Sequence, residues 1–112
     1  MYSCYDDPMA KYQLVLHFPE NAFPSFDAMV NLEDTLIDML HPDHLVDGHD
    51  IGSGTINIFI ITKDPKRAFA SASKILHSRK LLPVLRAAYR DVDEEVFHVL
   101  WPEGDTKPFE VI

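Results

Sequence analysis

Residues 55–62, TINIFIIT, are the clearest predicted strand in the chain and decide the fold class. β-branched and aromatic residues dominate the stretch, and such residues suit the pleated surface of a sheet. Its side chains alternate, with the isoleucines at even positions on one face and Phe59 and Ile61 on the other. A glycine-bearing turn at 52–54 links it to the short, polar run 43–51, and this combination predicts a hairpin.

Two helices are predicted on either side of this hairpin. Ser25 is a good N-cap, and apolar residues at helical spacing follow it to about residue 41, where Pro42 ends the helix. Asp64 is a second N-cap, followed by proline at the first helical position. Pro83 interrupts the second apolar pattern, which then resumes, so we expect the second helix to be kinked or split there.

Two further strands are predicted at the ends of this core. Residues 11–18 and 96–101 both alternate between two faces. Residues 1–10 form a polar N-terminal leader, and residues 102–112 form a C-terminal tail in which 109–112 could add a short edge strand. The length suits one domain spanning 1–112. The element order β-α-β-β-α-β therefore predicts an α+β fold.

Over residues 11–101 this order resembles the ferredoxin-like fold, or α/β plait. The resemblance implies a four-stranded antiparallel sheet in strand order 4-1-3-2, with the helices on one face. It is one of topology, since no family motif accompanies it. The glycine-rich anion loop of acylphosphatases has no counterpart at 19–24, and the paired cysteines of metal-carrier domains are absent. The fold hosts many functions, so the resemblance implies none of them.

Composition narrows the function classes. The 18 Asp and Glu residues outnumber the 10 Lys and Arg residues, which gives a net charge of -8. Such a charge repels nucleic acids and anionic membranes, so we expect neither as a partner. Cys4 is the single cysteine, which rules out an intramolecular disulfide. With no signal-peptide pattern and no long apolar stretch, the expected location is the cytoplasm.

The first candidate surface is an acidic stripe on the predicted first helix. Its members recur at offsets of four, three and four, so they share one helix face with no Lys or Arg between them. Acidic residues just beyond the helix could extend the stripe into a docking site for a basic protein. The alternative is an ordinary solvated face. The candidate residues are Asp27, Asn31, Asp34, Asp38, Asp43 and Asp47.

The second candidate surface is the sheet face that the helices leave uncovered. Alternation directs to it a set of mainly apolar side chains, which suggests a ligand, a partner or a second copy of the chain. The alternative is that the tail, with Phe109, Val111 and Ile112, folds back over it. The candidate residues are Val15, His17, Phe59, Ile61, His98 and Leu100.

Histidines provide the remaining candidate chemistry. His17 and His98 lie on neighbouring strands of the predicted sheet, where they could form an acid–base pair or simply pack. His41, His44 and His49 lie among aspartates and are of the type that binds zinc, but their spacing along a helix-to-strand connection argues against a preformed site. We therefore expect no metal and no cofactor.

Two functions from different classes fit these features. The first is a small, acidic, non-enzymatic binding module, such as an inhibitor or immunity-type protein that docks a basic protein partner. The second is a homodimeric enzyme or small-molecule-binding domain that uses the apolar sheet face, as in dimeric α+β barrels. An amino-acid-sensing regulatory domain ranks third. The lack of a catalytic motif favours the binding module over an enzyme.

Overall fold

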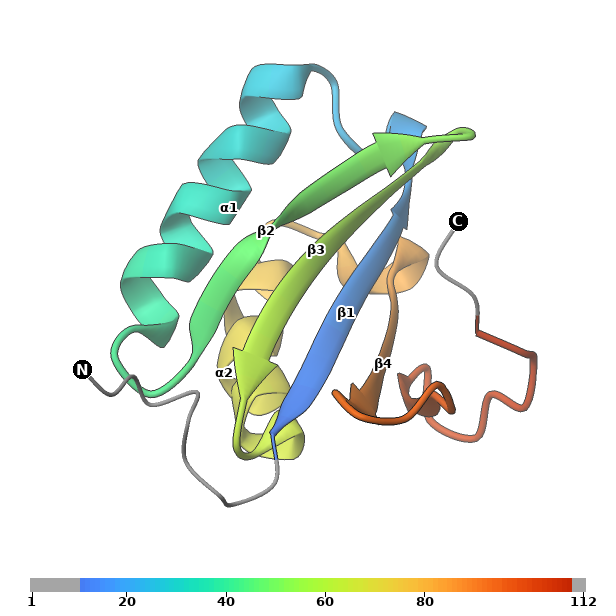
Figure 1. The fold of residues 1–112 in the computed structure, drawn as a ribbon. Coiled ribbons are helices and arrows are strands. Elements are labelled where there is room, and N and C mark those ends of the chain that lie inside the picture. Colours follow the sequence, from blue (N-terminus) through green and yellow to red (C-terminus); the bar gives the residue numbers. More distant parts are fainter. Residues whose placement is uncertain (1–10, 110–112) are drawn as a thin grey trace.

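A computed structural model describes residues 11–109 and confirms the α+β class (Figure 1). Its helices are α1 (Phe26–Leu40) and α2 (Pro65–Ser78), and its strands are β1 (Tyr12–Pro19), β2 (Leu45–Gly52), β3 (Thr55–Thr62), β4 (Arg86–Asp91) and β5 (His98–Trp101). Short 3-10 turns occur at η2 (Glu20–Ala22) and η3 (Leu82–Val84). The predicted leader, residues 1–10, lies outside the described residues.

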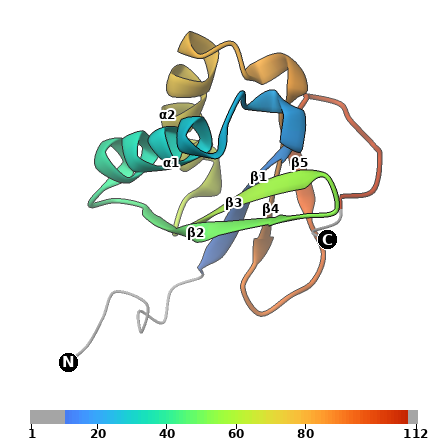
Figure 2. The ribbon, with the colours of Figure 1, turned by 90° about the horizontal axis from the view of Figure 1, so that it is seen from above.

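The strands form one five-stranded antiparallel sheet in the order β2-β3-β1-β4-β5. β1 is at its centre, and Leu14 of β1 lies opposite Ile60 of β3 and Tyr89 of β4. Both helices lie on one side of the sheet (Figure 2). This arrangement leaves the opposite sheet face without a helix among residues 11–109.

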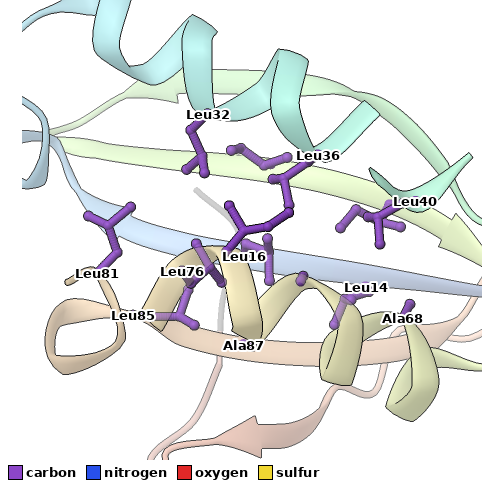
Figure 3. Close-up of a cluster of buried hydrophobic side chains, with 14 of the residues drawn as sticks. Leu14, Leu16, Leu32, Leu36, Leu40, Ala68, Leu76, Leu81, Leu85 and Ala87 are labelled. Carbon is purple, nitrogen blue, oxygen red and sulfur yellow. The ribbon is translucent and has the colours of Figure 1, made fainter. Parts of the chain in front are cut away.

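The main core lies between the helices and the sheet (Figure 3). Leu14 and Leu16 of β1 meet Leu32 and Leu36 of α1 and Leu76 of α2, and all five are fully buried. Burying each such side chain contributes about 1.5–3 kcal/mol to folding. The core therefore fixes which face of each helix points inward.

The predicted helix caps are confirmed. Ser25 accepts a hydrogen bond from the Ala28 N–H at 3.2 Å, and Asp64 accepts one from the Arg67 N–H at 3.1 Å. Each cap satisfies a backbone donor that the first helical turn leaves unpaired. No helix within residues 11–109 has the length and apolar character needed to cross a membrane.

The predicted kinked or split second helix at Pro83 is wrong. Pro83 lies in the short turn η3, and the chain continues as strand β4. The apolar spacing that suggested a helix arises because β4 is buried on both faces. Leu85 and Ala87 pack into the main core, whereas Ala88 packs on the opposite side.

The predicted four-stranded sheet is also corrected. The strand expected at 96–101 is the shorter β5, and it pairs with β4 at the sheet edge. β4 takes the predicted place beside β1. Residues 102–109 of the tail contain no strand, and the edge strand expected at 109–112 lies largely outside the described residues.

Candidate functional site

All six residues of the predicted docking stripe are exposed, and we call them the acidic surface: Asp27, Asn31, Asp34, Asp38, Asp43 and Asp47. The four on α1 lie opposite its buried face, which Leu32 and Leu36 represent. Asp43 lies in the turn after α1, and Asp47 lies at a β-bulge in β2. Because α1 lies beside β2 (Figure 1), the acidic surface extends from one helix to the neighbouring edge of the sheet.

α2 brings basic side chains to one border of the acidic surface. The Arg79 guanidinium donates to Asn31 Oδ1 and to Thr35 Oγ1, both at 2.8 Å. Arg67 lies 4.0 Å from Asp43, and both side chains are largely exposed. Asn31 is thus already engaged by the chain itself. By contrast, the three aspartates of α1 form no ion pair within residues 11–109.

A partly buried contact between His49 and Glu33 joins β2 to α1. His49 Nδ1 lies 3.0 Å from both carboxylate oxygens of Glu33, and Phe26 packs edge-on against the His49 ring at 6.1 Å. The sequence interpretation missed Glu33, although its spacing from Met29 and Leu36 places it on the apolar helix face. The pair fixes the position of β2 beneath α1.

The open sheet face carries four of its six predicted residues. Val15 lies opposite Phe59, and His17 lies opposite Asn57, in the alternate register to the residues of the main core. Ile61 lies opposite Gln13 on the same face. Val15, His17, Phe59 and Ile61 therefore share the open sheet face.

His98 and Leu100 lie elsewhere. His98 pairs with Tyr89, and their rings lie 5.2 Å apart on the helix side, where His98 lines a pocket of about 440 Å³. Leu100 packs against the main core. The unexpected strand β4 explains both differences, because His98 pairs with Tyr89, whose side chain faces the helices, and alternation then directs Leu100 to the same face. His17 and His98 consequently lie on opposite faces and form no acid–base pair.

The C-terminal tail covers the centre of the open face. Phe109 is only 9% exposed and clusters with the fully buried Val15 and Ala88. Its ring lies 5.1 Å from that of Phe97 and 5.8 Å from that of His17. The tail alternative raised by the sequence is thus what the structure shows, at least as far as Phe109.

Arg86 of β4 holds this tail in place. It donates to Asp105 at 3.0 Å, to the Lys107 carbonyl at 3.0 Å and to the Pro108 carbonyl at 3.2 Å, and it lies over the Phe109 ring. The Lys107 N–H, and then Arg86, lower the pKa of Asp105 below its ordinary value. The sequence interpretation missed Arg86. The one feature that could have indicated its role is that it is a charged residue inside an apolar run.

A polar pair lies beside Phe109 on the same face. His17 Nδ1 donates to Asn57 Oδ1 at 2.7 Å, and Asn57 is 1% exposed. Asn57 Nδ2 is buried without a hydrogen-bond partner among the described residues. An unsatisfied buried amide costs about 1–3 kcal/mol, so this position lowers stability.

The three histidines near the α1–β2 turn do not converge. His41 is exposed, His49 binds Glu33, and His44 is buried with its Nδ1 2.7 Å from Thr62 Oγ1. Burial lowers the pKa of His44. No group of three or more His, Cys, Asp or Glu residues suited to a metal ion occurs within residues 11–109.

Comparison with protein-family models, curated proteins and solved structures finds no match. The surfaces described above therefore carry the functional argument.

Proposed function

We propose that this chain is a small, acidic, non-enzymatic module that docks a basic protein partner through the acidic surface, as an inhibitor or immunity-type protein would. The observation that carries the proposal is the exposure of Asp27, Asp34 and Asp38 on one helix face without ion pairs in the described chain. Asp34 and Asp38 lie four residues apart, and like charges at that spacing destabilise a helix by a few tenths of a kcal/mol. A partner of opposite charge would offset this cost.

Charge and geometry favour a protein as the partner. The net charge of -8 steers a basic partner toward the molecule and repels nucleic acid. The acidic surface spans a helix, a turn and a strand, so its charges are not confined to one element. The chain has a single cysteine and so has no disulfide of its own that would require an oxidising compartment. We therefore place it in the cytoplasm.

The test compares two charge reversals of equal size. One variant carries Asp27→Lys, Asp34→Lys and Asp38→Lys. The control carries Asp93→Lys, Glu94→Lys and Glu95→Lys, in the exposed turn before β5. Both variants change the net charge equally. We expect cross-linking in the native host to capture a basic partner with the wild type and the control, and to lose it with the α1 variant. Retention by the α1 variant, or equal loss by both, would refute the proposal.

The alternative proposal is a homodimeric enzyme or small-molecule-binding domain that uses the open sheet face. Phe59 and Ile61 are half-buried there, but Phe109 occupies the centre of the face. A second copy would have to displace the tail and break the contacts of Arg86. Light scattering at micromolar concentration separates the two proposals, because the acidic module is expected to be a monomer.

We also propose that the fold is a ferredoxin-like plait with one added strand. The order β2-β3-β1-β4 within the sheet, with both helices on one face, supports this assignment. In this assignment β4 is the fourth strand of the plait, and β5 extends its edge.

A further inference from the structure

β2 forms an outer edge of the sheet. It pairs with β3 along Leu45–Gly52, and no strand within residues 11–109 pairs with its other side. In an antiparallel ladder, alternate residues direct their N–H and C=O groups away from the partner strand. β2 therefore presents backbone donors and acceptors that another strand can use.

The edge carries exposed apolar and acidic side chains, with His49 between the two aspartates. Leu45 and Ile51, near the two ends of β2, are 39% and 40% exposed. Asp47 and Asp50 lie between them and are also exposed. An incoming segment would thus meet apolar contacts at both ends of the strand and negative charge in the middle.

A small, mainly apolar pocket, whose lining also includes Glu20, adjoins one end of the edge. Its volume is about 270 Å³, and Phe26 and Met29 of α1 line it together with Ile51 of β2 and Ile56 of β3. Peptides that add to a sheet edge gain affinity from main-chain hydrogen bonds and specificity from pockets that receive their side chains. This pocket lies where one apolar side chain of an added strand would enter.

A second copy of the chain is a poor occupant of this edge. Two copies meeting edge to edge would bring together the Asp47 and Asp50 carboxylates of both, along with two acidic surfaces. Like charges placed across paired strands are destabilising. The edge instead matches a segment of opposite charge.

We propose that the β2 edge receives an extended, basic segment of the protein partner as an added strand, with one apolar side chain in the pocket between Phe26 and Ile51. This inference rests on the proposed function and specifies its docking mode. Lysine or arginine side chains of the segment would lie near Asp47 and Asp50, and the acidic surface on α1 would contact the rest of the partner.

The test uses a short, capped synthetic peptide of alternating lysine and valine. A second peptide carries N-methyl groups on alternate residues, which block hydrogen bonding along one edge and keep the charge. We expect the first to bind and to slow amide exchange in β2, and the second to bind at least about tenfold more weakly. The Ile51→Lys variant should lose binding, whereas Val96→Lys, at a 63% exposed site away from β2, should not.

Equal binding of both peptides would overturn the strand-addition inference, because charge alone would then suffice. Absence of binding up to millimolar concentration would overturn it as well. Neither result decides whether the acidic surface docks a basic protein. That proposal is tested separately, by whether reversal of the α1 charges releases the captured partner.

Discussion

Removing the Phe109 ring should release the tail from the open sheet face. Burial of a phenylalanine side chain stabilises a protein by about 1.5–3 kcal/mol. The ring pair with Phe97, at 5.1 Å, adds about 0.5–1.5 kcal/mol. Because the tail can detach instead of enclosing a cavity, the loss is limited to the free energy of tail docking. We expect Phe109→Ala to lower the free energy of unfolding by about 2–3 kcal/mol.

Val96→Ala is the control, because Val96 is an apolar residue that is 63% exposed. Its effect on the free energy of unfolding should stay within about 0.5 kcal/mol, as for most surface substitutions. Urea titration followed by Trp101 fluorescence measures both variants. Trp101 is the only tryptophan, and its indole N–H donates to the Leu82 carbonyl at 2.9 Å in the folded state.

A hydrophobic dye provides a second readout. Released from its site, the tail leaves Val15 and Ala88 open to solvent, so Phe109→Ala should bind the dye 8-anilinonaphthalene-1-sulfonate while still folded. If Phe109→Ala matches Val96→Ala in stability and binds no additional dye, Phe109 does not cover the open face and this reasoning fails.

Three further outcomes test individual contacts. His49→Ala leaves the Glu33 carboxylate buried without its partner, so it should lower the free energy of unfolding, measured by urea titration, by about 1–3 kcal/mol. An unchanged midpoint would show that water replaces the imidazole. Burial makes the pKa of His44 lower in the folded than in the unfolded chain, so the stability of the protein should fall as the pH drops below about 6.5. In thermal melts, His44→Gln should make this decline less steep. A decline of the same slope in the variant would contradict the role of His44. Asp105→Ala should lower the protection factor of the Lys107 amide, which donates to Asp105 at 2.9 Å. Because the pKa of Asp105 is lowered, its contribution is lost as the pH falls through that pKa, so the protection factor, taken relative to the unfolded amide at the same pH, should fall there too. An unaltered protection factor would contradict this contact.

The sequence predicted the elements whose periodicity is regular. β1 and β3 alternate clearly, and Ser25 and Asp64 mark the starts of both helices. The sequence did not predict β4 as a strand. A strand buried on both faces loses its alternation, and its apolar residues then fit a helical period equally well. With β4 missing, β5 was assigned its place beside β1.

The candidate sites also differ in whether a local sequence pattern predicts them. Helical spacing alone places Asp27, Asp34 and Asp38 on one face, so the acidic surface was predictable. The tail contacts were not, because Arg86 reaches residues 19 to 22 positions later in the chain, and no local pattern records such pairing. The bulge at Asp47 likewise depends on how β2 pairs with β3.

The central position of β1 has a consequence for how the chain folds. β1 lies between β3 and β4, so residues near position 14 can pair only after residues near 60 and near 89 have been synthesised. Contacts so distant in sequence slow folding, because loop closure costs entropy before pairing repays it. During synthesis on the ribosome, the apolar β1 segment is therefore made early and stays unpaired on one side until β4 has emerged. Over that interval it is the segment most exposed to chaperones and to aggregation.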